Sequence, residues 1–207
     1  MNEIDDQEKL LLQVKDTSEI MIDMAYSSLI FHDRELANEV LQLNDFVKDL
    51  NSQLEQIVVE RVSQNKDFDR AITYIRLSRA MEDIGDSAEK IADVVLRDIK
   101  VHPVLAESIL ESGTSIAREV IQANSVLVGK RLRETSLATD TGWFVIVVKR
   151  GPKWIIGPDG ETVLEPRDII FARGPLESRG HLCRLCRGKT KQIQFVPDPS
   201  SDPDITC

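Results

Sequence analysis

The sequence lacks the features that mark secreted and membrane-spanning proteins. Its three cysteines are too few for a disulfide framework, which suits a reducing compartment. It has no uncharged apolar run of about 18–20 residues, the length that spans a bilayer, so we expect no direct membrane insertion. The first residues, MNEIDDQEKL, carry neither the basic segment nor the apolar run of a signal peptide. These absences predict a cytoplasmic protein.

Nucleotide-binding and catalytic motifs are also missing. Neither G-x-G-x-x-G nor G-x-x-x-x-G-K-[ST] occurs, which argues against a Rossmann or P-loop unit. The three histidines are scattered, so no Ser/His/Asp or Cys/His set can be assembled and no catalytic residue is predicted. A net charge of −9 disfavours binding to nucleic acid or to an anionic membrane surface. The sequence therefore predicts a non-enzymatic protein.

Proline and glycine divide the chain sharply. Residues 1–100 contain no proline and one glycine, whereas residues 101–207 hold all eight prolines and nine glycines. This shift predicts a boundary between two structural classes. We expect four segments: a helical domain over 1–101, a linker with a short helix over 102–113, a small α/β domain over 114–196 and a disordered tail over 197–207.

Apolar stripes in the first hundred residues predict three long helices. The middle stripe alternates spacings of four and three, which is typical of helices packed side by side at a shallow angle; its members are Leu36, Val40, Leu43, Val47, Leu50, Leu54 and Ile57. Short polar turns near residues 31–33 and 63–67 separate the helices, which predicts an up-down-up three-helix bundle. The third helix is expected to bury Tyr74, Leu77, Met81, Ile84, Ala88, Ile91 and Val95.

Beyond residue 113 the apolar pattern changes to short β-rich runs. These runs predict strands at 117–123, 143–149, 153–156 and 168–172, with a further candidate strand at 191–196. Residues 128–132 are expected to form a helical turn and residues 176–186 a closing helix. The predicted fold class is thus α plus α/β in two domains.

The segment MEDIGDSAEKIA, residues 81–92, resembles the signature on the third helix of PhoU domains, a family named for the regulator of bacterial phosphate uptake. The signature core corresponds to Glu82, Ile84, Gly85 and Asp86, with Asp83 where the family usually has arginine. The family's Glu/Asp-x-x-x-Asp pattern also occurs on its first helix, where Glu19 and Asp23 fit it. The resemblance implies a helical domain that docks on transporters and, in some relatives, carries metal ions on its carboxylates.

The C-terminal half resembles the C-terminal domain of TrkA-type potassium-uptake regulators, also called RCK-C. Three motifs carry the resemblance: Ser125-x-x-Val128-Gly129-Lys130-x-Leu132, Val145-Ile146-x-Val148-x-Arg150-Gly151 and Thr162-x-Leu164-x-Pro166-x-Asp168. Arg167 stands where the family commonly has glycine. The resemblance implies a homodimer that binds a small ligand, in some relatives cyclic di-AMP, in the groove between subunits.

Acidic rows on the first and third helices are candidate metal sites. On the third helix Glu82 and Asp86 share a face with Glu89 and Asp93, and like charges four residues apart destabilise a helix by a few tenths of a kcal/mol. One compensating group would be a divalent or ferric cation held by Glu19, Asp23, Glu82 and Asp86, since hard cations prefer oxygen ligands. The alternative is a solvated face neutralised by Arg79, Lys90 and Arg97.

Basic residues in the α/β domain are candidate ligand contacts. Arg150 and Lys153 flank one predicted turn, and Lys130 and Arg131 lie in the predicted helical turn. In an acidic protein, such local cations could bind an anion such as a cyclic dinucleotide, or they could point separately into solvent.

The segment His181-Leu182-Cys183-Arg184-Leu185-Cys186 supplies three potential zinc ligands, whereas a zinc site needs four. It is better explained as the buried edge of a helix.

Three functions are compatible with these patterns. The first is a cytoplasmic regulatory subunit of a cation channel or transporter, with potassium as the expected ion, acting as a ligand-sensing homodimer. The second is a metal-binding scaffold in phosphate-uptake signalling. The third is a dimerisation adaptor with no ligand.

Overall fold

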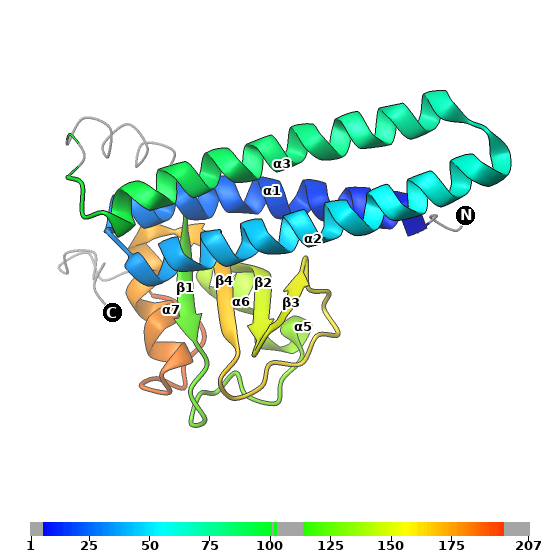
Figure 1. The fold of residues 1–207 in the computed structure, drawn as a ribbon. Coiled ribbons are helices and arrows are strands. Elements are labelled where there is room, and N and C mark those ends of the chain that lie inside the picture. Colours follow the sequence, from blue (N-terminus) through cyan, green and yellow to red (C-terminus); the bar gives the residue numbers. More distant parts are fainter. Residues whose placement is uncertain (1–5, 101, 103–113, 197–207) are drawn as a thin grey trace. The chain divides into compact units, whose positions relative to one another are not determined.

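The chain divides into two compact units, residues 1–109 and residues 110–207, here called the helical unit and the sheet unit. The computed structural model describes residues 6–100, 102 and 114–196 (Figure 1). A bundle of helices followed by a sheet with helices confirms the predicted fold class. Apart from residue 102, the expected linker helix lies outside the described residues, as does the expected disordered tail.

The helical unit is an up-down-up bundle of α1 (Asp6–Phe31), α2 (Arg34–Asn65) and α3 (Phe68–Leu96), in which each helix packs against both others. Aspartates start the second and third helices by capping free backbone N–H groups. Asp33 Oδ1 accepts from Leu36 N at 2.9 Å, and Asp67 Oδ1 accepts from Arg70 N at 3.2 Å. Both turns lie where the sequence predicts them. Within the described residues, no helix is both long and apolar enough to cross a membrane.

The buried face of α3 is rotated from the expected one. Leu77 and Ile84, predicted to be core residues, are 43% and 41% exposed. The buried positions carry mostly small side chains: Ala71, Ser78, Gly85, Ala88, Ala92 and Val95. Small residues let neighbouring side chains reach the helix closely, so the larger Leu77 and Ile84 lie on its flank. The apolar stripe alone gave the wrong centre for this face.

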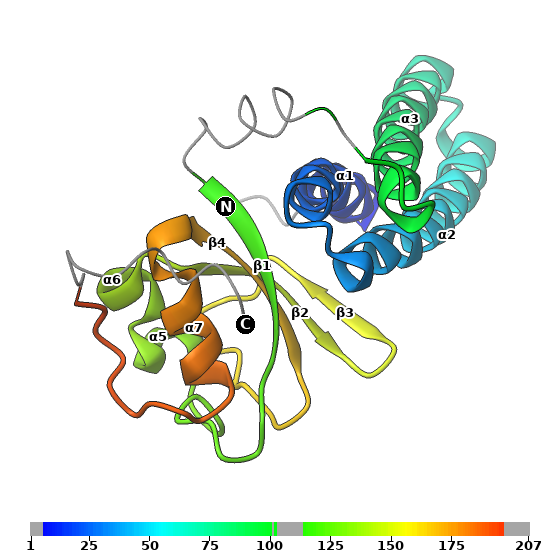
Figure 2. The same ribbon diagram turned by 90° about the vertical axis from the view of Figure 1, so that its left-hand side faces the viewer.

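The sheet unit contains one antiparallel sheet in the order β1-β4-β2-β3. Its strands are β1 (Thr114–Val120), β2 (Phe144–Arg150), β3 (Lys153–Ile156) and β4 (Ile169–Pro175). Helices α5 (Leu132–Thr135), α6 (Leu137–Thr141) and α7 (Arg179–Cys186) lie on one side of the sheet (Figure 2). The four predicted strands are present, although the first begins three residues earlier than expected.

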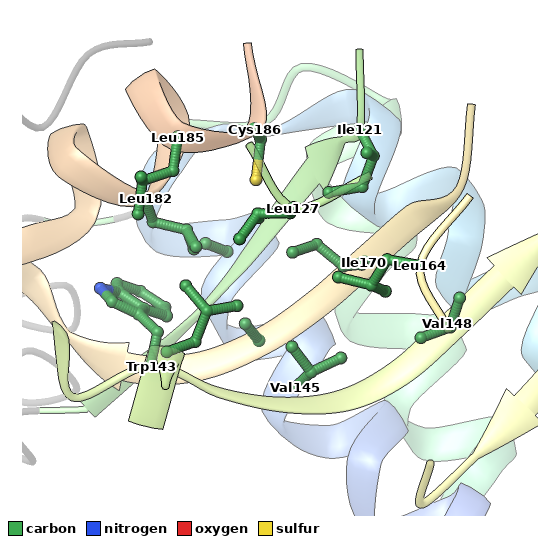
Figure 3. Packing of buried hydrophobic residues seen from close by; sticks show 13 residues of the cluster. Ile121, Leu127, Trp143, Val145, Val148, Leu164, Ile170, Leu182, Leu185 and Cys186 are labelled. Atoms are coloured by element: carbon green, nitrogen blue, oxygen red, sulfur yellow. The ribbon is translucent and has the colours of Figure 1, made fainter. Parts of the chain in front are cut away.

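The core of the sheet unit lies between the sheet and its helices (Figure 3). Its largest member is Trp143, which is fully buried and donates its indole N–H to Ser178 Oγ at 2.8 Å. Leu182, Leu185 and Cys186 of α7 belong to the same cluster. Burial raises the pKa of the Cys186 thiol well above its usual value, which disfavours the reactive thiolate. Cys186 is therefore a packing residue, as the helix interpretation expects.

Two local predictions in the sheet unit are wrong. Residues 191–196 form no strand, because their backbone bonds to helical elements: Phe195 N donates to Asp140 O at 2.9 Å, and His181 Nε2 donates to Ile193 O at 2.8 Å. The helical turn expected at 128–132 is displaced to the short helix α5, and α6 has no counterpart in the prediction.

Candidate functional sites

A layer of polar side chains joins α2 to α3 in the helical unit. We call it the α2–α3 polar layer; it consists of Asn44, Lys48 and Asn51 on α2 and Glu82, Asp86 and Glu89 on α3. Asn44 Nδ2 donates to Asp86 Oδ1 at 2.9 Å and also to Glu89. Asn51 Nδ2 donates to Glu82 Oε2 at 2.8 Å. Lys48 Nζ lies 3.2 Å from Asp86 Oδ1 and 3.9 Å from Glu89 Oε2.

The α2 side of this layer was not found from the sequence. Asn44 is fully buried and Asn51 is 4% exposed, although both are polar. A signal was present, since the two asparagines lie seven residues apart, each next to a leucine of the regular stripe. A polar residue at heptad spacing beside an apolar stripe indicates a polar contact between helices.

Gly85, inside the PhoU-like signature, lets the Asn44 side chain of the layer approach α3 closely. A Cβ at this position would lie 2.8 Å from Asn44 Oδ1 and 3.4 Å from Met21 Cε. Glycine weakens a helix interior by about 1 kcal/mol relative to alanine, so its presence here has a packing reason. The signature therefore has a structural role: glycine opens the helix surface, and the flanking acids accept hydrogen bonds from α2.

The layer shifts two ionisation equilibria. The hydrogen bond from Asn44 lowers the pKa of Asp86, against the opposing effect of burial and with further help from Lys48. For Lys48, burial lowers the pKa, but the hydrogen bond to Asp86 and the charges of nearby acids together raise it above its usual value. Both groups therefore stay charged at neutral pH.

The four carboxylates predicted to hold a metal are not brought together as one site. In the described parts of the chain, no three His, Cys, Asp or Glu side chains form a group able to hold a metal ion. Glu19 pairs with Lys15 of its own helix at 2.7 Å. Glu82 and Asp86 accept hydrogen bonds from α2. N–H donors of α2 thus face Glu82 Oε2 and Asp86 Oδ1, two of the oxygens that the predicted metal site would use.

Of the basic residues predicted to neutralise the acidic row on α3, Arg97 pairs with a member of that row. Arg97 Nε lies 2.5 Å from Asp93 Oδ2, within α3. Arg79 pairs instead with Glu55 of α2 at 3.4 Å. The main neutralising residue of Asp86 is Lys48, which the sequence did not single out.

Arg150, a predicted ligand contact, is used inside the sheet unit. Its guanidinium donates to both oxygens of Asp168 at 2.8 Å, to Glu165 Oε1 at 2.6 Å and to the carbonyl of Val163 at 2.7 Å. Asp168 is 1% exposed and its hydrogen bond raises the pKa of Arg150. Arg150 therefore ties the β2 end to the loop before β4, which links two of the three motifs that resemble RCK-C.

The turn before Asp168 is kept despite the loss of the family's usual glycine. Arg167 adopts a left-handed backbone with φ +73°. Its N–H donates to Ile121 O at 2.8 Å, and Ile121 N donates to Asp168 O at 2.8 Å. These two backbone bonds hold the loop in a conformation that glycine adopts more easily.

The other predicted ligand contacts lie at the surface. Arg131 forms a backbone bridge with Val163, whose carbonyl also binds Arg150, so these two arginines meet at one segment. The Arg131 side chain lies 3.3 Å from Glu161, which also pairs with Arg133. Lys130 is half-buried, and Lys153 is exposed at the start of β3. Three of the four predicted contacts are thus accessible to a ligand.

A cavity of about 230 Å³ opens in the sheet unit, and Arg133 is the cation in its lining. It is formed by α5, α6, the start of β2 and the loop at 158–160; its lining includes Arg133, Ser136, Thr139, Phe144 and Asp159. Phe144 is 61% exposed, an unusual position for a large aromatic side chain. Apolar walls with a cation at the rim suit a planar ligand bearing negative charge. Sequence patterns alone did not indicate Arg133 or Phe144.

Comparison with known families divides the chain at the same place as the structure does. Residues 11–95 match the PhoU domain and residues 116–187 match the TrkA-C domain. The first match covers α1 to α3 and contains the α2–α3 polar layer. The second covers the sheet unit from β1 to α7 and contains the Arg150–Asp168 pair.

Two relatives come from Methanocaldococcus jannaschii. "Probable potassium channel protein 2" is 28% identical over 89 residues, which is 43% of this chain and 26% of that protein. "Potassium channel protein 1" is 30% identical over 95 residues, which is 44% of this chain and 28% of that protein. This chain therefore spans only about a quarter of each channel protein.

Two further similarities are weaker guides. The mouse "Non-structural maintenance of chromosomes element 1 homolog" is 27% identical over 169 residues, covering 79% of this chain and 60% of that protein. A solved structure of the RCK_C domain dimer of Streptococcus agalactiae BusR with c-di-AMP is 19% identical, with a TM-score of 0.35, over 37% of this chain and 95% of that one. Family matches and motifs together show a region that matches the PhoU domain followed by a region that matches the TrkA-C domain.

Proposed function

We propose that the chain is a non-catalytic regulator of potassium transport that acts in the cytoplasm through a channel or transporter partner. The observation that carries this proposal is the joining of a PhoU domain to a TrkA-C domain, together with similarity to two proteins named as potassium channels. In this arrangement the sheet unit senses a ligand and the helical unit passes the signal to the partner.

The ligand we propose is a small anionic nucleotide, with cyclic dinucleotides as the first candidates. Lys130, Arg131 and Lys153 offer accessible positive charge, and Arg133 stands at the rim of the cavity beside Phe144. Each well-aligned charge-assisted contact contributes roughly 1.5–3 kcal/mol. Contacts from two protomers would support micromolar binding, which corresponds to about −8 kcal/mol. Arg150 would act indirectly, by holding the segment from Val163 to Asp168.

A thermal-shift titration of the full chain tests the ligand. Cyclic di-AMP, cyclic di-GMP, AMP, ATP and NAD are each added at millimolar concentration, where a micromolar ligand raises the melting temperature by several degrees. Lys130→Ala with Arg131→Ala should abolish the shift, whereas Lys191→Ala, an exposed cation of the same unit, should retain it. No shift with any nucleotide would contradict ligand sensing and leave a dimerisation adaptor.

We also propose that the chain forms a homodimer through its sheet unit. β1 and β3 form the two edges of a four-stranded sheet, and small sheets with open edges gain stability when pairing covers them. Sedimentation equilibrium of the full chain should give twice the monomer mass at micromolar concentration. A monomer at every concentration, with and without ligand, would contradict the dimer.

A phosphate-uptake scaffold is the second candidate function, and the match to the PhoU domain supports it. The two candidates predict different growth defects when the gene is deleted in its source organism. A regulator of potassium transport gives a defect that depends on external potassium. A defect that follows phosphate alone would overturn the first proposal in favour of the second.

A further inference from the structure

The acidic face of α3 needs a positive charge close to it. Glu82, Asp86 and Glu89 lie at intervals of four and three residues, so they fall on one helix face, and all three are half-buried. Neighbouring like charges that are partly removed from water destabilise each other and the helix. The structure must therefore hold a compensating group at this face, either a bound cation or a residue of the chain.

We propose that Lys48 supplies this charge from within the chain, in place of a metal ion, and that the α2–α3 polar layer forms without metal. The Lys48 ammonium lies 3.2 Å from Asp86 Oδ1 and 3.9 Å from Glu89 Oε2. It is a compact charge with three N–H donors, and it thus interacts with two carboxylates at once and offsets one of their two negative charges.

The amides of α2 donate to one oxygen of each carboxylate. Asn44 Nδ2 donates to both Asp86 and Glu89, and Asn51 Nδ2 donates to Glu82. A hard cation binds oxygen lone pairs at short range, and here one oxygen of each carboxylate already accepts N–H hydrogens. A metal at Asp86 and Glu89 would have to displace the Lys48 ammonium, which lies against the same oxygens.

Within the described residues, the buried amide oxygens of Asn44 and Asn51 accept no hydrogen bond, which would make them candidate metal ligands. Asn44 Oδ1 instead lies against Gly85, at 2.8 Å from the position that a Cβ would take there. Rotating this amide by 180° would place its oxygen against two carboxylates, which is repulsive, so the hydrogen bonds fix its orientation. The oxygen of Asn44 therefore faces the backbone of α3 and not a cation.

A groove between α2 and α3, next to the polar layer, is lined by charges of both signs. A cavity of about 670 Å³ next to Asn51 and Glu82 is lined by Lys48 and Arg79 as well as by Glu55 and Asp83. Arg79 pairs with Glu55 across the two helices at 3.4 Å. The groove thus contains two built-in cations, and each lies on a different side of Glu82. Lys48 and Arg79 each pair with an acid on the other helix, so cations of the chain offset acids across α2 and α3 at more than one position.

Replacing Lys48 tests the proposal directly. Lys48→Met keeps the aliphatic stem and removes the charge; Lys15→Met is the matched control, because Lys15 also pairs with an acid and is 43% exposed against 42% for Lys48. The melting temperature of the full chain is measured with EDTA and with 1 mM MnCl₂. The unsubstituted chain should melt at the same temperature in both. Lys48→Met should melt about 2–4 °C lower in EDTA, and manganese should restore part of the loss.

Metal uptake gives a second, independent measurement. Calorimetric titration with Mn²⁺ should show no site in the unsubstituted chain, a site in Lys48→Met, and none in Lys48→Met combined with Asp86→Asn. Stoichiometric uptake by the unsubstituted chain that Asp86→Asn removes would overturn the proposal. A melting temperature for Lys48→Met equal to that of Lys15→Met would also overturn it, because Lys48 would then neutralise nothing of consequence.

Discussion

The two units use the acidic residues of their motifs in different ways. In the helical unit, Asp86 is 40% exposed and shares its partners with Glu89 in a layer of several modest contacts. In the sheet unit, Asp168 is 1% exposed and accepts three hydrogen bonds, two from Arg150 and one from Glu165 N. A shared, half-exposed layer tolerates the loss of one member, whereas a buried pair does not. The comparison predicts unequal costs for similar substitutions.

The largest expected effect is that of Asp168→Ala. It removes the acceptor of Arg150 and of Glu165 N and leaves a partly buried guanidinium without its main partner. We expect the sheet unit to lose about 3 kcal/mol of stability. Chemical denaturation of the full chain, followed by Trp143 and Trp154 fluorescence, measures this unit because both tryptophans belong to it. A loss as small as that of Glu165→Ala would show that the buried pair is not the dominant contact.

Two glycines, one in each unit, allow a second comparison of the two units. A buried aromatic ring lies against Gly174, and the amide of Asn44 lies against Gly85. A Cβ at Gly174 would lie 2.4 Å from Cδ2 of the buried Trp143, which has no room to move. Gly174→Ala should therefore cost about 2 kcal/mol by overpacking. At Gly85 the nearest atom, Asn44 Oδ1, is the end of a side chain, and alanine regains about 1 kcal/mol of helix propensity. Gly85→Ala should therefore cost less than Gly174→Ala, although the buried Asn44 must shift; a larger loss there than at Gly174 would contradict this argument.

A substitution that restores the family's glycine should stabilise the sheet unit. Arg167 has φ +73° and an exposed side chain, so Arg167→Gly removes backbone strain without removing a buried contact. The left-handed conformation costs a non-glycine residue roughly 1–2 kcal/mol, part of which glycine loses again through its greater freedom when unfolded. We expect a gain of about 0.5–1 kcal/mol in the same denaturation experiment. Arg167→Ala, which keeps the strain, is the control and should show no gain.

The sequence predicted the elements better than their faces and contacts. The helix boundaries followed from the polar turns, whose signal lies within a few neighbouring residues. The buried face of α3 was predicted wrongly. A search for apolar spacing selects the large residues Leu77 and Ile84, whereas the buried face carries small residues such as Gly85 and Ser78. Packing of α3 depends on which residues α2 presents to it, and that information lies some forty positions away.

The same limit explains the candidate sites. The motifs contain Glu82, Asp86, Arg150 and Asp168, which the fold uses for internal contacts. Their partners did not follow from the sequence. Lys48 was not singled out, and Arg150 was assigned to a ligand, whereas in the structure they pair with Asp86 and Asp168. A charged residue in a motif therefore indicates a contact, and only the fold shows whether that contact is internal or reserved for a ligand.

The smallest expected effect, that of Asp86→Asn, depends on pH. The folded state lowers the pKa of Asp86, so the charged carboxylate contributes stability above its unfolded pKa of about 4 and loses it as pH falls through the lower folded value. Because Asp86 is 40% exposed, we expect Asp86→Asn to cost only about 0.5 kcal/mol at pH 7. Urea denaturation monitored by circular dichroism should show the difference shrinking toward zero near pH 3. A difference that grows as the pH falls would mean that Asp86 is destabilising when charged, and the acidic face of α3 would then lack an effective partner on α2.

Salt provides a second measurement on Asp86→Asn. The main cause of the lowered pKa of Asp86 is the hydrogen bond from Asn44. Salt screens such a hydrogen bond less than it screens a charge pair, so part of the stability difference at pH 7 should persist in 1 M NaCl.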